Sequence, residues 1–91
     1  MKVQLKVVAL LEKRVFKSAN GQDVEAVPML LEQGRDQFFA EAYGTSALTL
    51  PENLGGGDYV WADLSFSTGW SVKEGKKQYW QRVLISNVSR V

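Results

Sequence analysis

The sequence contains no cysteine and no histidine. Without cysteine there are no disulfide bonds, thiolate zinc sites or cysteine nucleophiles. Without histidine the chain lacks the side chain that most often acts as a general base near neutral pH. These absences exclude the most familiar catalytic arrangements. We therefore expect a protein that is not an enzyme and that uses no metal ion or other cofactor.

Long apolar runs are also missing near the N-terminus. The longest run there, Val7–Leu11, has five residues and is flanked by Lys6 and Glu12. A secretory signal or a membrane-spanning helix needs a longer apolar stretch. We expect a cytoplasmic protein that does not engage a membrane.

The charges nearly balance, but they are unevenly distributed along the chain. Eleven Lys and Arg residues face ten Asp and Glu residues, for a net charge of +1. Residues 1–17 and residues 73–91 each carry five basic residues and one acidic residue, whereas residues 18–72 carry one basic and eight acidic residues. Two basic ends with an acidic middle would orient the protein toward a polyanion if the ends lie together in space.

The pattern of apolar and polar residues predicts five strands and one short helix. Alternation with a period of two residues is typical of half-buried strands. Asn20-Gly21 favours a hairpin turn, a hydroxyl-capped apolar segment between Gly44 and Leu54 predicts the helix, and residues 67–78 are predicted to form a loop or flexible hairpin tip. The predicted strands are residues 2–7 with a bent continuation to Phe16, 24–32, 37–43, 59–66 and 79–88.

This order of elements matches the five-stranded OB-fold barrel, in which a short helix lies between strands 3 and 4. We predict a single OB-fold domain over residues 1–91. An SH3-like barrel is the main alternative, and the apolar segment at residues 46–54 favours the OB-fold. In an OB barrel strand 1 lies beside strand 4, and strand 3 pairs with strand 5. The loop between strands 1 and 2 and the loop between strands 4 and 5 flank the ligand face. In this chain both loops contain basic residues, so we expect the two basic ends to converge there.

Several aromatic side chains can be assigned to a face from this pattern. Tyr79 and Trp80 are adjacent and must point to opposite faces of their strand. Because Val83 and Ile85 share the parity of Tyr79, we place Tyr79 in the core and Trp80 outside. Phe39 and Tyr43 are predicted to face outward, and the phenylalanines predicted to lie in the core are Phe16, Phe38 and Phe66.

The segment from Asp58 to Val88 resembles the C-terminal half of the core of bacterial and phage single-stranded DNA-binding proteins. The similarity lies in a strand at Tyr59–Phe66, Trp70 four residues later, the basic tip Lys73–Lys77, and Tyr79 leading the aliphatic residues Val83, Leu84 and Ile85. A weaker similarity covers residues 37–44. In that family the aromatic residue just beyond strand 4 stacks on a nucleobase, and Trp70 is the matching position. In the family, basic residues precede this aromatic residue. Here Ser67, Thr68 and Gly69 precede Trp70, so phosphate contacts are expected from other positions.

Single-stranded DNA binding requires aromatic surfaces for the bases and a cationic groove for the phosphates. We therefore predict binding of single-stranded DNA with little sequence preference, by a homodimer or homotetramer that links several small sites. The candidate stacking residues are Trp70, Trp61 and Trp80. The candidate phosphate contacts are Lys13, Arg14, Lys17, Lys73, Lys76, Lys77 and Arg82.

Other interpretations of the same residues remain open. The outward aromatics are also typical of an OB-fold protein interaction module, in which they would form an oligomer interface. An RNA-binding barrel would use the same stacking surfaces. The carboxylates of Glu32, Asp36 and Glu41 lack companion ligands at a spacing that would indicate a metal site.

Overall fold

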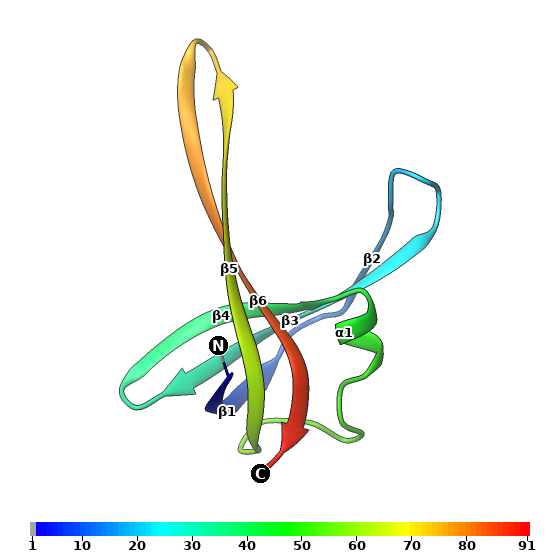
Figure 1. The fold of residues 1–91 in the computed structure, drawn as a ribbon, viewed down its shortest axis with the longest axis vertical. Coiled ribbons are helices and arrows are strands. Elements are labelled where there is room, and N and C mark those ends of the chain that lie inside the picture. Colours follow the sequence, from blue (N-terminus) through cyan, green and yellow to red (C-terminus); the bar gives the residue numbers. More distant parts are fainter. Residues whose placement is uncertain (1) are drawn as a thin grey trace.

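Six strands and one four-residue helix make up most of residues 2–91, the part of the chain that the computed structural model describes (Figure 1). The helix α1 (Thr45–Leu48) lies between β4 and β5. The strands are β1 (Lys2–Leu10), β2 (Arg14–Lys17), β3 (Asp23–Gln33), β4 (Asp36–Tyr43), β5 (Tyr59–Lys73) and β6 (Lys76–Arg90).

Five of the six strands close into a barrel. β1 pairs with both β3 and β5, β3 pairs with β4, and β5 pairs with β6, all antiparallel. A parallel pairing of β4 with β6, at Glu41 and Leu84, completes the ring. With the short helix between its third and fourth strands, this is the OB-fold barrel, as predicted. The sixth strand, β2, adds to the free edge of β3.

The barrel core consists of side chains that alternate inward along these strands. Val60, Ala62 and Leu64 are buried on β5, whereas Tyr59 and Trp61, which alternate with them, are exposed. This is the alternation that the sequence predicts for a half-buried strand. The largest fully buried side chains are Leu5, Val7, Met29, Leu31, Val60 and Ile85. Ala47 and Leu50, in and after α1, pack against this core from one side.

Pro28 lies within β3, at a point where that strand changes partner. Its neighbour Met29 pairs with Leu10 of β1, while Ala26 pairs with Arg14 of β2. The Pro28 carbonyl still accepts a hydrogen bond from the backbone of Leu11, at 2.9 Å. Proline is tolerated here because residues 11–13 lie outside the regular strands, so its missing N–H interrupts no ladder.

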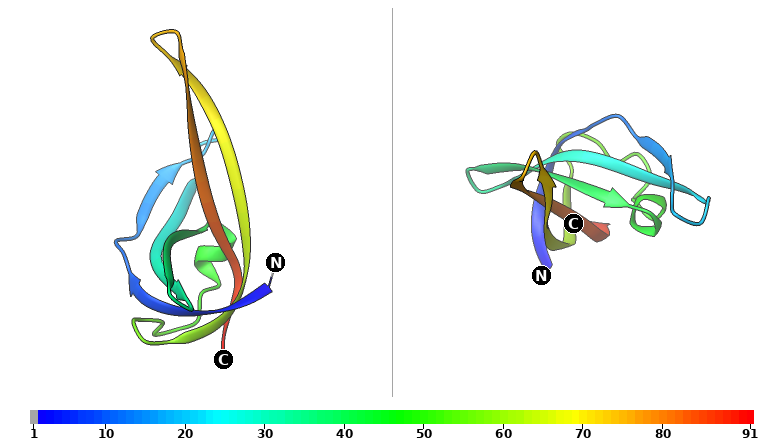
Figure 2. Two further views of the ribbon diagram at one scale, coloured as in Figure 1. Left: turned by 90° about the vertical axis from the view of Figure 1, so that its left-hand side faces the viewer. Right: turned by 90° about the horizontal axis from the view of Figure 1, so that it is seen from above.

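Residues 67–78, predicted to form a loop or a flexible hairpin tip, do form a hairpin, but β5 and β6 continue through them as a two-stranded ribbon up to the turn. We call residues 67–82 the long arm; it projects well beyond the barrel (Figures 1 and 2). Its turn has only two residues, Glu74 and Gly75, with φ angles of 53° and 77°. Positive φ at both positions is the geometry of the tight hairpin turn whose twist matches that of strands. Each strand satisfies the backbone groups of the other, so the arm needs no buried face.

A second projection, the short arm, comprises residues 14–26, in which β2 pairs with the first part of β3. Its turn contains Gly21 at a φ of 82°, in the segment where Asn20-Gly21 predicts a turn. Both arms project toward the same end of the barrel, and β3 and β4 lie between them (Figure 1).

The arms explain why three aromatic residues are not in the core. Phe16 lies on the short arm. Phe66, at the base of the long arm, is 57% exposed, and Tyr79, within the long arm, is 75% exposed. The assignment of these three to the core is therefore wrong. Tyr79 does share the parity of the buried Ile85, but Tyr79 lies in the part of β6 that extends beyond the barrel. Phe38 is partly buried against the core, as predicted.

None of the helices in residues 2–91 is long and apolar enough to cross a membrane.

Candidate nucleic-acid interface

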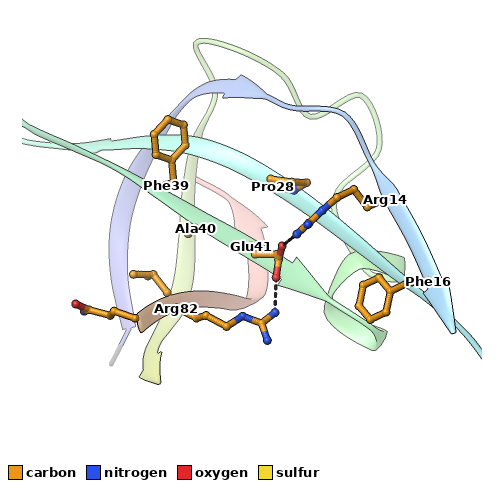
Figure 3. Close-up of a pocket in the computed structure, with 9 residues that line it drawn as sticks. Arg14, Phe16, Pro28, Phe39, Ala40, Glu41 and Arg82 are labelled. Carbon is orange, nitrogen blue, oxygen red and sulfur yellow. Dashed lines mark hydrogen bonds and ion pairs between the residues drawn. The ribbon is translucent and has the colours of Figure 1, made fainter. Parts of the chain in front are cut away.

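A groove of about 460 Å³ lies between the two arms, on the outer face of β3 and β4 (Figure 3). It combines aromatic side chains with two guanidinium groups, and the β4 chain at Ala40 forms part of its wall. The residues that line it include Arg14 and Phe16 from β2, Pro28 from β3, Phe39 and Glu41 from β4, and Gln81 and Arg82 from β6.

Strand alternation determines which β4 side chains reach the groove face. Ala40 and Ala42 are buried in the barrel, so Phe39, Glu41 and Tyr43 face outward. The ring of Tyr43 lies 5.5 Å from that of Phe16 across the short arm. The outward side of β4 therefore presents an aromatic residue on each side of a carboxylate.

Glu41 lies between the two arginines of the groove. Its Oε2 atom accepts a hydrogen bond from Nη2 of Arg14, and its Oε1 atom accepts one from Nη2 of Arg82 (Figure 3). The Arg82 guanidinium also lies over the ring of Tyr43, 5.5 Å from its centroid. Two predicted phosphate contacts that are distant in sequence, Arg14 and Arg82, thus meet at one carboxylate.

Lys13 and Lys17, on either side of Arg14 in the sequence, are paired as well. Lys13 lies 3.2 Å from Glu25, and Lys17 lies 3.4 Å from Asp23. These pairs are exposed, and exposed ion pairs contribute about 0 to 1 kcal/mol. Both lysines can therefore exchange a carboxylate for a phosphate at little cost.

The tip of the long arm carries three lysines that form no ion pair in the described part of the chain. Across residues 2–91, no carboxylate lies within 4 Å of the ammonium groups of Lys73, Lys76 or Lys77. Lys73 and Lys76 are direct cross-strand partners. Like charges in this position are unfavourable, so the pair is not explained by stability of the hairpin.

Trp80 lies on the face of the long arm that continues from the groove. It is two residues from Arg82 on the same strand and therefore shares its face. Its cross-strand partner is Gly69, and the Trp80 ring lies across that glycine. An exposed ring held flat against a strand offers a surface on which a base can stack.

Trp70 lies on the opposite face of the arm. It pairs directly with Tyr79, and the ammonium group of Lys77 lies 4.6 Å from the centroid of its ring. Both aromatic rings are exposed, as are Phe66 and Val72. The long arm thus has an aromatic residue on each face rather than a single stacking surface.

Trp61 is separate from these surfaces. It lies near the start of β5, between Gln4 of β1 and Ser89 of β6, on the outside of the barrel. The groove is lined by other strands, so the structure does not bring Trp61 to the other predicted contacts.

Sequence reasoning missed part of this site. It placed Phe39 and Tyr43 outside the barrel but proposed no role for them, and it assigned Phe16 to the core. The outward parity of Phe39, Glu41 and Tyr43 is a signal that could have indicated all three β4 residues. No sequence signal pairs Glu41 with arginines that are 27 and 41 positions away.

Within residues 2–91, no group of three or more acidic side chains is placed to hold a metal ion. No model of a known protein family matches the sequence, and no curated protein matches it either.

Proposed function

We propose that this protein binds single-stranded DNA with little sequence preference. The observation that carries the proposal is the continuous surface formed by the groove and one face of the long arm. Along it lie Arg14, Arg82, Trp80 and the tip lysines Lys73 and Lys76, which share the parity of Trp80. Cations alternate there with exposed aromatic rings, which is the combination that single-stranded nucleic acid requires.

The cations of this surface suit a flexible polyanion. Arginine presents a planar set of donors that matches phosphate oxygens, and lysine acts as a mobile point charge. The short arm contributes Arg14 to this surface, and the long arm contributes Lys73, Lys76 and Arg82. The other predicted phosphate contacts lie beside it: Lys77 is over Trp70 on the opposite face of the long arm, and Lys13 and Lys17 pair with Glu25 and Asp23 of the short arm. We propose that the strand passes between the arms and follows the long arm.

The aromatic residues account for the lack of sequence preference. Stacking on an aromatic ring contributes about 1 to 3 kcal/mol per base and accepts any base, because every base has a π-face. Trp80 and Phe39 offer rings on the groove side, and Trp70 offers one on the other face of the arm. Trp61 is not included in the proposed site.

A homodimer or homotetramer would increase affinity, because linked sites bind one strand at a high effective concentration. The exposed rings of Phe66, Trp70 and Tyr79 also favour a second candidate function, a protein interaction module. A contiguous exposed apolar surface often marks a protein interface.

Tryptophan fluorescence in a titration with oligo(dT) tests the proposal. We would use a Trp61→Phe variant, so that only Trp70 and Trp80 report. We expect quenching, with an affinity that falls steeply between about 50 mM and about 200 mM salt as phosphate counterions are released. Unchanged fluorescence at low salt would falsify DNA binding and favour the interaction module. A parallel titration with oligo(U) compares RNA with DNA.

A further inference from the structure

Glu41 gives the groove a lower positive charge than its two arginines imply. Its side chain is only 13% exposed, whereas those of Arg14 and Arg82 are 62% and 45% exposed. Both carboxylate oxygens are engaged, one by each guanidinium group. The three side chains together carry one net positive charge, so a large part of the attraction for an anion is already satisfied within the protein.

The backbone alone does not bring the two guanidinium groups together. Arg14 belongs to β2 and Arg82 to β6, and these strands are separated in the sheet by β4 and β3. The Arg14 side chain crosses β3 to reach Glu41 on β4, and Arg82 reaches it from the neighbouring strand on the other side. The carboxylate is the point at which the two cations converge.

A phosphate group offers the same interaction as this carboxylate. It presents negatively charged oxygens that accept charge-assisted hydrogen bonds from guanidinium groups. Two arginines that share one anion are therefore already spaced to share another. Both keep much of their surface open to solvent, so a phosphate can approach them from the groove.

We infer that Arg14 and Arg82 form a binding site for a phosphate group, and that Glu41 fills this site as an internal counter-anion in the free protein. An incoming phosphate competes with the Glu41 carboxylate, which lowers the affinity and the salt dependence of binding. The inference rests on the proposed function only for the source of the phosphate, which would be the DNA backbone.

The variant Glu41→Gln tests this inference because it removes the charge and nearly preserves the shape. Inorganic phosphate would be titrated while the side-chain Nε–H signals of Arg14 and Arg82 are followed by nitrogen-15 NMR at constant ionic strength. We expect saturable shifts of both signals in Glu41→Gln and much smaller shifts in the wild type. Adding Arg82→Gln to the variant should abolish the phosphate-dependent shift of the Arg14 signal.

Glu32→Gln is the matched control. It removes the same charge from β3, where Glu32 is the cross-strand partner of Lys6 and does not line the groove. A general effect of net charge would appear in both variants, whereas a specific site would appear only in Glu41→Gln. Thermal melting confirms that each variant is folded, and Glu41→Ala is the second variant if glutamine prevents folding.

The same variants would then be titrated with oligo(dT). Glu41→Gln should bind about fivefold more tightly at low salt, the effect of removing one repulsive charge about 4 Å from a phosphate in water. The slope of log affinity against log salt should steepen by about 0.7 for each additional phosphate neutralised.

The outcomes separate this inference from the proposed function. Phosphate shifts in Glu41→Gln no larger than those in Glu32→Gln would overturn the inference. Weaker oligo(dT) binding by Glu41→Gln would also overturn it and identify Glu41 as a positioning residue for the arginines. If Glu41→Gln binds inorganic phosphate but neither protein binds oligo(dT), the phosphate site stands and the proposed function fails.

Discussion

Trp80 lies across Gly69 of the neighbouring strand so closely that a Cβ atom on Gly69 would lie 2.1 Å from Cζ2 of the Trp80 ring. No real side chain tolerates that separation from an aromatic ring. The glycine therefore creates the space in which the ring lies flat on the arm. Gly69 belongs to the polar segment 67–78, for which the sequence predicts a loop or hairpin tip, and this segment provides the surface on which the exposed Trp80 ring lies.

Replacing Gly69 with alanine should displace the Trp80 ring. We expect a changed near-UV circular dichroism signal and an oligo(dT) affinity reduced toward that of Trp80→Ala. The arm is exposed, so the free energy of unfolding should change by less than about 1 kcal/mol. Ser71→Ala, two residues further along the same strand, is the control. A variant that retains the wild-type spectrum and affinity would show that the flat position of Trp80 has no role in binding.

The three tryptophans should differ in their contribution to DNA binding. Trp80→Ala and Trp70→Ala should each weaken oligo(dT) binding by about 1 to 3 kcal/mol, the value of one stacked base. Trp61→Ala should leave the affinity unchanged, because Trp61 lies away from the groove and the arm. Fluorescence anisotropy of a labelled oligonucleotide measures all three. If Trp70→Ala binds normally but alters the oligomeric state, that face of the arm serves protein contacts.

The tip lysines should dominate the salt dependence of binding. Replacing Lys73, Lys76 and Lys77 with serine should reduce the slope of log affinity against log salt by about 2, since each phosphate contact on a single strand contributes about 0.7. Replacing Lys13 and Lys17, which are already paired with acids, should have a smaller effect per residue. Equal effects per residue would contradict this assignment.

The single substitution Lys76→Glu should separate stability from binding. Lys76 directly faces Lys73 across the hairpin, so the change replaces a repulsive pair with an attractive one. We expect a stabilisation of about 0.2 to 1 kcal/mol, the usual range for cross-strand pairs, together with weaker oligo(dT) binding. Thermal melting and the DNA titration measure the two effects. A less stable variant would indicate that the two lysines do not repel each other in solution.

Core membership predicts a clear contrast in stability. Leu31 is fully buried in the barrel, so Leu31→Ala should lower the free energy of unfolding by about 2 to 5 kcal/mol. Phe66→Ala should cost clearly less, because the Phe66 side chain is mostly exposed at the base of the arm. Urea denaturation of both variants measures the difference. A similar loss in the two variants would place Phe66 in a buried environment, such as an interface between copies of the chain.

The barrel could be predicted from the amino-acid sequence. Alternation such as that of Val60, Ala62 and Leu64 records which side of a strand meets the core, because burial selects apolar residues at every second position. The order of strands and the apolar segment at the helix then left the OB-fold as the best match. The lack of cysteine and histidine likewise excludes thiol and imidazole chemistry, because no fold can supply a side chain that the chain does not contain.

The positions of the long arm, the groove and the ion pairs could not be predicted in this way, because they depend on how distant segments pack. The arm is held by backbone pairing between its own strands and contributes nothing to the core, so its polar, glycine-containing sequence indicates a loop or hairpin tip rather than two long strands. The meeting of Arg14, Glu41 and Arg82 depends on strand order and register across three distant segments. Local sequence preferences describe the surroundings of a single segment, whereas a binding surface is assembled by the packing of several.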